Sequence, residues 1–198
     1  MTGGRIIRVA GAIAEAQPFG DAALYELVEV GERRLLGEVI RLRDDVATIQ
    51  VFEETSGLAL GEPVRRTGSS LTIQLGPGLL GSTFDGMGRP LQGLADASGD
   101  FIAPGMAMPT LDPKARWDFT PSVEPGTDVA GGDELGVLEE RPGLMHRILV
   151  PPGRSGRVAS LEQGAFSVSD EIGALGDGTP LHLSHAWTIR ERRPIGER

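Results

Sequence analysis

Three glycines have the spacing that most plainly suggests chemistry, because Gly76, Gly78 and Gly81 match the pattern G-x-G-x-x-G. In a dinucleotide site, glycines at these positions let backbone N–H groups approach a phosphate, provided that a strand precedes the pattern and a helix follows it. Residues 71–75 could form that strand, but two glycines and a proline between residues 86 and 90 would cut the helix short. The pattern therefore predicts a turn-forming connector rather than a cofactor site.

A second phosphate-binding pattern, G-x-x-x-x-G-K-[S/T], does not occur in the 198 residues. That loop holds phosphates with backbone N–H groups and with a lysine at a fixed offset from the glycines. The single lysine, Lys114, has no such loop before it. We therefore expect this chain alone to have no catalytic residue for ATP hydrolysis, no bound cofactor and no tight affinity for ATP.

The remaining chemically capable side chains do not form a recognisable site. His182 and His185 would share a face of a helix, but residues 181–187 alternate as in a strand, where positions three apart face opposite sides. We therefore expect no metal site. The neighbouring carboxylates of Glu53-Glu54 and Glu139-Glu140 are interpreted as solvated turns rather than as acid–base pairs, which usually converge from separate elements.

The composition is that of an ordinary globular chain with an acidic balance. It is 39% hydrophobic and 24% charged, with a formal net charge of −9 and no cysteine. Nucleic-acid binders need basic surfaces to neutralise phosphates, so that class is disfavoured. The absence of cysteine excludes disulfides and thiolate metal sites. There is no apolar stretch of the length of a membrane span and no signal-like start, so we expect a cytoplasmic protein.

The elements that would position these residues are mainly strands. Runs that suit half-buried strands occur at residues 5–10, 24–30, 35–42 and 46–52, and Asp44-Asp45 between two of them predicts a hairpin turn. Short strands at this spacing favour a small closed barrel in the first 70 residues. Residues 76–111 are rich in glycine and proline, so we expect a structured connector with at most a helical turn at 79–84.

A weak internal repeat indicates a second β-domain. Residues 123–138 and 161–175 both run from an apolar residue, Glu, any residue and Gly to Asp-Glu-apolar-Gly-x-Leu. Two copies predict a pseudo-twofold sandwich that resembles the barrel-sandwich hybrid of biotinyl and lipoyl carriers. Such carriers present a modified lysine between the two halves, but the midpoint here, residues 139–143, has none, so carrier function is excluded.

Several motifs follow one another along the chain. They are E-E-T-S-G-L at 53–58, a Gly-rich run at 75–86 followed by R-P-L, W-x-F-x-P at 117–121, and H-R-I-L-V-P-P-G at 146–153. In this order they resemble the N-terminal third of the catalytic A subunit (alpha in prokaryotes) of V/A-type rotary ATPases. The residues that carry the resemblance are Glu53, Glu54, Gly57, Gly76, Pro77, Gly78, Gly81, Asp85, Gly86, Arg89, Pro90, Trp117, Pro151, Pro152 and Gly153.

The resemblance implies a mainly β architecture and a role in assembly. Residues 1–70 would be the barrel of the headpiece crown, 71–111 a connector that begins the nucleotide domain, 112–188 the outward bulge domain, and 189–198 a return to the nucleotide domain. The family couples ATP synthesis or hydrolysis, with Mg²⁺, to H⁺ or Na⁺ transport. Its members contact A-type and B-type headpiece subunits and, through the bulge, a peripheral stalk subunit, and they lie peripheral to the membrane without inserting into it.

Two alternatives remain open at the level of the sequence. A free-standing, non-catalytic interaction module derived from this family would have a stop codon at residue 198 and few exposed apolar patches. The family subunit itself would have a reading frame that continues into a phosphate-binding loop, and an apolar surface on the connector. An unrelated enzyme with scattered site residues is disfavoured, because no nucleophile–base or metal spacing supports it.

Overall fold

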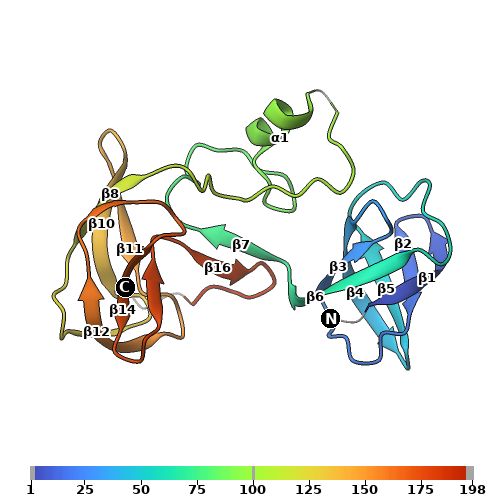
Figure 1. The fold of residues 1–198 in the computed structure, drawn as a ribbon, viewed down its shortest axis with the longest axis horizontal. Coiled ribbons are helices and arrows are strands. Elements are labelled where there is room, and N and C mark those ends of the chain that lie inside the picture. Colours follow the sequence, from blue (N-terminus) through green and yellow to red (C-terminus); the bar gives the residue numbers. More distant parts are fainter. Residues whose placement is uncertain (1–2, 100, 195–198) are drawn as a thin grey trace. The chain divides into compact units, whose positions relative to one another are not determined.

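The computed structural model describes residues 3–99 and 101–194, which form two compact units. The first unit comprises Met1–Thr72 with Gly93–Ala107, and the second comprises Ile73–Gln92 with Met108–Arg198 (Figure 1). The expected return segment at 189–198 falls outside the described residues from position 195 onward. None of the helices within 3–99 and 101–194 is long and apolar enough to cross a membrane.

The first unit is built on a closed antiparallel barrel, as expected from the strand pattern. Its strands are β1 (Gly4–Ala10), β2 (Ile13–Gln17), β3 (Glu26–Val30), β4 (Leu35–Arg43), β5 (Val46–Val51) and β6 (Pro63–Ser70), in the order β1-β2-β5-β4-β3-β6. Alternate side chains point inward, so that β3 buries Val28 and Val30 while Leu27 and Glu29 lie nearer the surface. Small and branched residues fill this narrow interior, including Ala14, Ala16 and Ile49.

Asp44 and Asp45 form the predicted hairpin turn between β4 and β5. Asp44 has a φ of 54°, a left-handed conformation that Asp tolerates better than most residues. The Oδ1 atom of Asp45 accepts hydrogen bonds from the backbone N–H groups of Phe19 and Gly20, each at 2.9 Å. The second aspartate therefore fastens the loop after β2 to the turn, which the sequence pattern did not indicate.

The prediction for the connector was wrong in one respect, since a helix, α1 (Leu91–Ser98), forms where only irregular structure was expected. Leu and Ala favour the helix between two breakers, Pro90 before it and Gly99 after it. Gly99 has a φ of 70° and its N–H donates to the Ala95 oxygen at 2.8 Å, a usual helix ending. At 79–84 the chain makes a turn, in which the Ser82 N–H donates to the Leu79 oxygen at 3.2 Å, and no helix.

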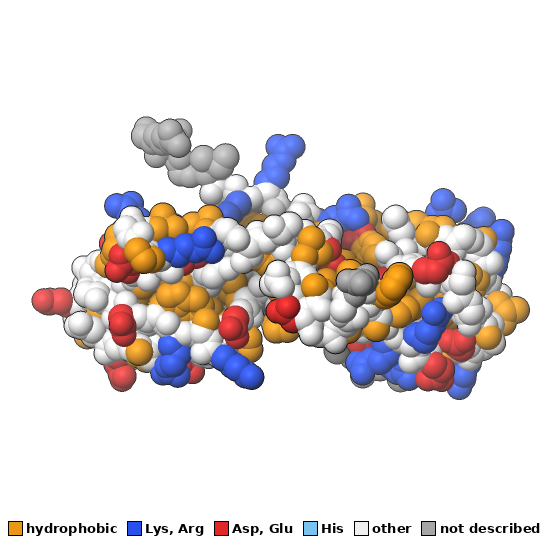
Figure 2. Space-filling model, turned by 90° about the horizontal axis from the view of Figure 1, so that it is seen from above, with side chains coloured by type: hydrophobic (Ala, Val, Ile, Leu, Met, Phe, Trp, Pro, Cys, Tyr) orange, Lys and Arg blue, Asp and Glu red, His pale blue; other side chains and the backbone are white. Residues whose placement is uncertain are grey.

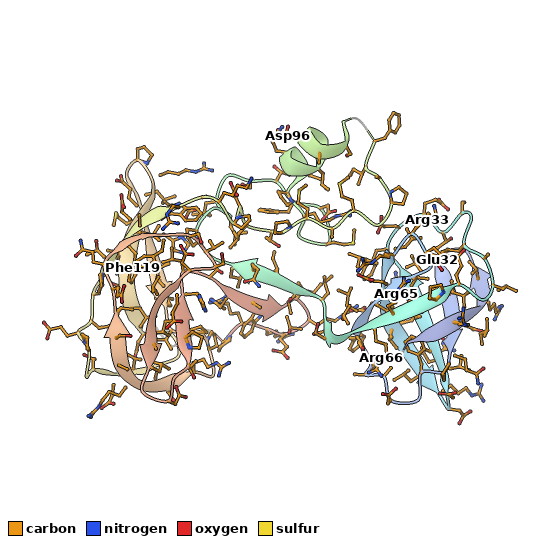
Figure 3. The ribbon with its side chains drawn as sticks, in the orientation of Figure 1. Glu32, Arg33, Arg65, Arg66, Asp96 and Phe119 are labelled. Atoms are coloured by element: carbon orange, nitrogen blue, oxygen red, sulfur yellow. The ribbon has the colours of Figure 1, made fainter. Side chains whose placement is uncertain are left out.

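The second unit contains the barrel-sandwich domain that the repeat predicts. One four-stranded sheet has the order β11-β10-β8-β13 and the other β15-β14-β12-β9. The strands are β8 (Trp117–Pro121), β9 (Asp128–Ala130), β10 (Glu134–Arg141), β11 (Leu144–Leu149), β12 (Ser155–Leu161), β13 (Gly164–Phe166), β14 (Glu171–Leu175) and β15 (Pro180–His182). Each copy of the repeat gives its short first strand, β9 or β13, to the sheet of the other copy. The two halves therefore exchange strands and share one core, which includes Phe119 (Figure 3).

The repeat residues have matching physical roles in the two copies. The Oδ2 atoms of Asp133 and Asp170 each accept a backbone N–H three residues earlier, both at 2.8 Å. The apolar residue two positions later is buried in both copies, as Leu135 and Ile172. The repeated sequence pattern therefore corresponds to a turn followed by a strand that enters the core.

Candidate functional site

Glu53, in the loop after β5, connects two segments of the first unit. Its Oε1 atom accepts the Leu36 N–H at 3.2 Å and its Oε2 atom accepts the Gly105 N–H at 2.8 Å. The interpretation of Glu53 as a solvated turn residue was therefore wrong, because both carboxylate oxygens bind backbone. Glu54 is exposed and accepts hydrogen bonds from the N–H and hydroxyl of Ser56, at 3.0 and 2.7 Å, so the turn interpretation holds for this residue.

The Gly-rich pattern lies in the second unit, where it contacts the hairpin formed by β10 and β11. The preceding strand, β7 (Thr72–Leu75), is present and pairs with β16 (His185–Thr188), but the pattern continues into turns rather than into a helix. The backbone N–H of Gly78 donates to Oε1 of Glu140 at 2.7 Å. The phosphate-site geometry is thus incomplete, and a carboxylate of the same chain meets the loop.

Glu140 is a second correction to the expected solvated turns, because its side chain is only 2% exposed. Its Oε2 atom lies 2.7 Å from Nδ1 of His146 on β11. Burial raises the pKa of Glu140, but the hydrogen bonds from His146 and from the Gly78 backbone outweigh it, so the pKa lies below the ordinary value. Glu140 is therefore a charged, fully bonded group and not a candidate general acid. Its neighbour Glu139 accepts the Gly143 N–H at 2.7 Å at the hairpin turn.

Asp85 and Arg89 organise the second half of the Gly-rich motif. The Oδ1 atom of Asp85 accepts the N–H groups of Met87 and Arg89, both at 2.9 Å, and its Oδ2 atom accepts Nε of Arg89 at 2.7 Å. Burial raises the pKa of Asp85, but the hydrogen bonds from the Arg89 backbone and side chain lower it by more. The pKa therefore lies below the ordinary value, and the carboxylate is ionised. The loop from Asp85 to Pro90 is closed by its own side chains, which explains why the motif contains an Asp and an Arg four residues apart.

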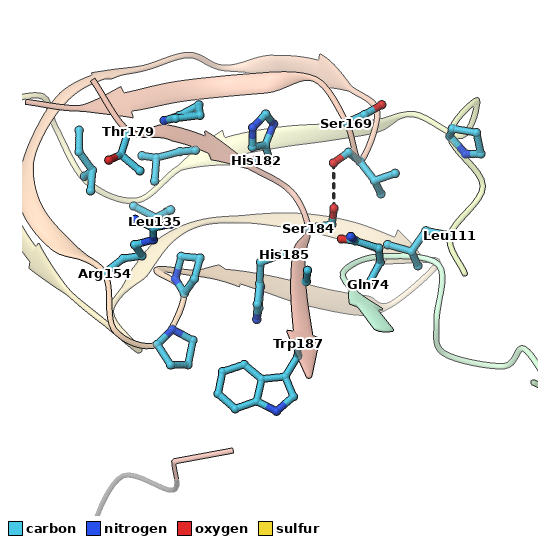
Figure 4. A pocket seen from close by; sticks show the side chains of 18 of the residues that line it. Gln74, Leu111, Leu135, Arg154, Ser169, Thr179, His182, Ser184, His185 and Trp187 are labelled. Carbon is cyan, nitrogen blue, oxygen red and sulfur yellow. Dashed lines mark hydrogen bonds between the residues drawn. The ribbon is translucent and has the colours of Figure 1, made fainter. Parts of the chain in front are cut away.

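Residues from the later motifs line a cavity of about 750 Å³ in the second unit (Figure 4). Pro151 and Pro152 lie on one part of its wall, with Trp187 and both histidines of the H-x-x-H pair. The prediction that these histidines lie on opposite faces of one strand is wrong. The chain instead ends β15 at His182 and starts β16 at His185, which brings both imidazoles to the same cavity.

The two imidazoles are held differently. Nδ1 of His182 donates to the Asp170 carbonyl oxygen at 2.9 Å. Nε2 of His185 is buried without a hydrogen-bond partner, and burial followed by the nearby charge of Arg193 lowers the pKa of this group, which favours the neutral ring. Within residues 3–99 and 101–194, no group of three or more His, Asp or Glu side chains is placed to hold a metal ion.

Trp117 and Gly153, two further motif residues, also have structural roles. A Cβ atom added to Gly78 would lie 3.5 Å from the ring of Trp117, so the Gly-rich loop passes close to this tryptophan. Gly153 has a φ of 77°, a conformation that few other residues adopt, and it ends the turn after the two prolines. The motif residues thus shape and fasten loops, and the structure brings the Gly-rich segment against Trp117 and against the β10–β11 hairpin.

Comparison with known proteins assigns both units to one kind of protein. Residues 6–68 match the ATP synthase alpha/beta family, beta-barrel domain, and residues 108–190 match the ATPsynthase alpha/beta subunit barrel-sandwich domain. The V-type ATP synthase alpha chain of Anaeromyxobacter dehalogenans (strain 2CP-C) is 48% identical over 98% of this chain. The A-type ATP synthase subunits A of Desulfurococcus sp. (strain SY) and Thermococcus kodakarensis are each 47% identical, over 96% and 98% of this chain. In all three cases the chain spans 34% of the relative's length.

Proposed function

Because this chain belongs to the family of catalytic A (alpha) subunits of V/A-type ATP synthases, we propose that it serves the assembly of such a complex. The complex would couple ATP synthesis or hydrolysis, with Mg²⁺, to transport of H⁺ or Na⁺. The observation that carries the proposal is the 48% identity that extends over 98% of the chain, through both domains in the same order. We place the assembled complex at the cytoplasmic side of a membrane, to which this chain would be peripheral.

We assign the two domains separate tasks within that role. Residues 1–70 would join neighbouring headpiece subunits in a ring of barrels, and residues 112–188 would contact a peripheral stalk subunit. Apolar side chains on the outside of the barrel support the first assignment, since Leu60 is 69% and Leu24 49% exposed. The second assignment rests on the family resemblance of the barrel-sandwich domain.

Exposed apolar side chains on the connector are consistent with a further domain that would cover them. Phe101 is 87% exposed in the first unit, and Leu80 is 52% exposed in the second. Figure 2 shows hydrophobic side chains at the surface among charged ones. Such side chains are expected of a subunit that packs against a nucleotide domain, and less so of an isolated interaction module.

A chimaera tests the proposed function. We expect that exchanging the corresponding third of the A. dehalogenans alpha chain for this sequence preserves assembly of the headpiece and ATP-driven ion pumping in vesicles. The matched control carries the same exchange with residues 112–188 deleted, and it should lose the stalk contact. A full-length chimaera that folds but does not assemble with the other headpiece subunits would contradict the proposal.

The chain by itself is expected to bind ATP with a dissociation constant weaker than about 1 mM, since a phosphate clamp of Mg²⁺, lysine and positioned backbone N–H groups is what ATP-hydrolysing sites use. Isothermal titration calorimetry with Mg·ATP checks this directly. A micromolar dissociation constant would overturn the prediction. The A. dehalogenans alpha chain assembled in its headpiece serves as the positive control.

A further inference from the structure

We propose that Glu140 is the built-in anion of the Gly-rich segment and fixes residues 78–81 to the β10–β11 hairpin. Glycine-rich turns that point successive backbone N–H groups toward one spot form a concave site for an anion. In this chain the Glu140 carboxylate lies at that spot, 2.7 Å from the Gly78 nitrogen, with a further interaction from the Leu80 backbone. The Gly-rich turn thus binds a carboxylate of its own chain.

A bulge in β10 explains how Glu140 reaches the segment. In the register of β10 and β11, Glu139 lies opposite Met145 and Arg141 lies opposite Leu144, so Glu140 is an extra residue in its strand. A bulge of this kind turns a side chain away from the direction that strand alternation would give it. The redirected carboxylate is 2% exposed, and its other oxygen is bound by His146 from the neighbouring strand at 2.7 Å. The hairpin therefore presents a buried charge in one defined orientation.

Arg141, the next residue, makes a second contact to the same segment. Its Nη2 atom donates to the Leu80 carbonyl oxygen. Gly81 has a φ of 77°, and a Cβ atom at this position would overlap with the Arg141 guanidinium. The hairpin thus binds an N–H on one side of the turn through Glu140 and a C=O on the other side through Arg141. Any side chain at position 81 would push the arginine away.

The hydrogen bonds to Glu140 make its ionised form the stable one. The His146 ring and the Gly78 N–H both bind the carboxylate, and together they outweigh its burial. A buried carboxylate that accepts several N–H hydrogen bonds holds its partners more strongly than a neutral acceptor does. If the proposed function is right, this contact would make the connector move with the barrel-sandwich domain, so that a load on the domain reaches the nucleotide domain through the hairpin. The contact itself does not depend on that role.

Amide hydrogen exchange of the 198-residue chain tests the contact. We expect Glu140→Ala to accelerate exchange in residues 78–82 by about tenfold or more, since a hydrogen bond to a charged group is lost. Exchange in β12–β15 should stay within about twofold of the wild type, because the contact is local. Sodium formate, which supplies a small carboxylate, should restore part of the protection in Glu140→Ala, and sodium chloride at equal ionic strength should not.

The control is Glu139→Gln, which removes the same charge from the neighbouring position of the hairpin and should leave residues 78–82 protected. Glu140→Gln covers the case in which the alanine variant does not fold, and it should show a smaller but measurable acceleration. Unchanged exchange at 78–82 in both Glu140 variants would overturn the proposal. If formate and chloride change the exchange equally, the claim that a bound carboxylate protects residues 78–82 is wrong. Neither result would bear on the chimaera experiment, so failure of this contact and failure of the assembly role can be told apart.

Discussion

Replacing Arg66 by methionine is expected to lower the free energy of unfolding of the barrel by about 3–5 kcal/mol. Arg66 on β6 and Glu26 on β3 form two N–H···O hydrogen bonds of 2.9 Å (Arg66 is labelled in Figure 3). The side chains are 11% and 2% exposed, so water cannot replace the guanidinium if it is removed. The carboxylate would keep only the backbone N–H groups of Ala23 and Gly68, at 3.1 and 3.0 Å.

The neighbouring arginine provides the matched control. Arg65 pairs with Glu32 at 3.6 Å, and these side chains are 46% and 72% exposed, so Arg65→Met should cost less than about 1 kcal/mol. Urea unfolding can be followed by hydrogen exchange in peptides from residues 26–51. These peptides lie in the first unit, so the signal reports on the barrel alone. If Arg66→Met and Arg65→Met lower the free energy of unfolding equally, the buried ion pair stabilises the barrel no more than the exposed one.

The same pair sets a pH dependence. Burial raises the pKa of Glu26, but hydrogen bonds from Arg66, Ala23 and Gly68 outweigh it, so the pKa in the folded barrel lies below the ordinary 4.5. The stabilisation by this group is therefore complete above pH 4.5 and is lost as the pH falls through the lower folded value. Glu26→Gln should flatten the stability profile in that window, and a profile with the wild-type slope would contradict the assignment.

The parts of the fold that could be predicted are those encoded by local patterns. The runs at residues 35–42 and 46–52 predicted β4 and β5. In β5 the alternation has a packing reason, because Ala47, Ile49 and Val51 enter the barrel core. β2 was not identified, since its sequence I-A-E-A-Q has only small and polar residues after the first position. In a narrow barrel those alanines are the core, Ala14 and Ala16 being fully buried, so low apolar volume hid a central strand.

The contacts of the candidate site could not be predicted from spacing. Gly78 and Glu140 are 62 positions apart, and the carboxylate reaches the loop only because β10 contains a bulge. Two neighbouring glutamates in a sequence predict solvated side chains. The extra residue in β10 buries the side chain of Glu140 instead. Helix α1 was missed for a related reason, because the density of glycine and proline around it outweighed the Leu, Gln and Ala residues of this eight-residue segment.

The exchange of strands between the two repeat copies was also beyond the pattern, but the glycine that both copies share has a packing role. Gly136 lies opposite Pro121 in one sheet and Gly173 lies opposite Leu161 in the other. A Cβ atom at Gly136 would overlap with the Thr120 carbonyl oxygen, and one at Gly173 would overlap with that of Ser160. The glycine of each copy is therefore required where its strand crosses closest to the neighbouring strand of its sheet.

Gly173→Ala is accordingly expected to destabilise the barrel-sandwich domain by about 3 kcal/mol, because an atom forced against backbone can be accommodated only by moving a strand. For a domain of this size that corresponds to a fall in Tm of roughly 10 °C or more. Gly136→Ala should behave alike, since the pseudo-twofold places it equivalently. Calorimetry, with the fluorescence of Trp117 and Trp187 as a reporter on the second unit, would measure both.

Gly176→Ala, in the turn directly after β14, is the control, because its added Cβ would lie 3.5 Å from the Arg157 oxygen, an ordinary contact. Its Tm should change by less than about 3 °C, the shift expected of a substitution that creates no clash or cavity. If Gly173→Ala and Gly136→Ala unfold at the wild-type temperature, then the strands are not held at the separation described. In that case strand packing would not require the glycine that the two copies of the repeat share. A loss confined to one copy would mean that the two halves of the sandwich are not equivalent in stability, although their strand orders match.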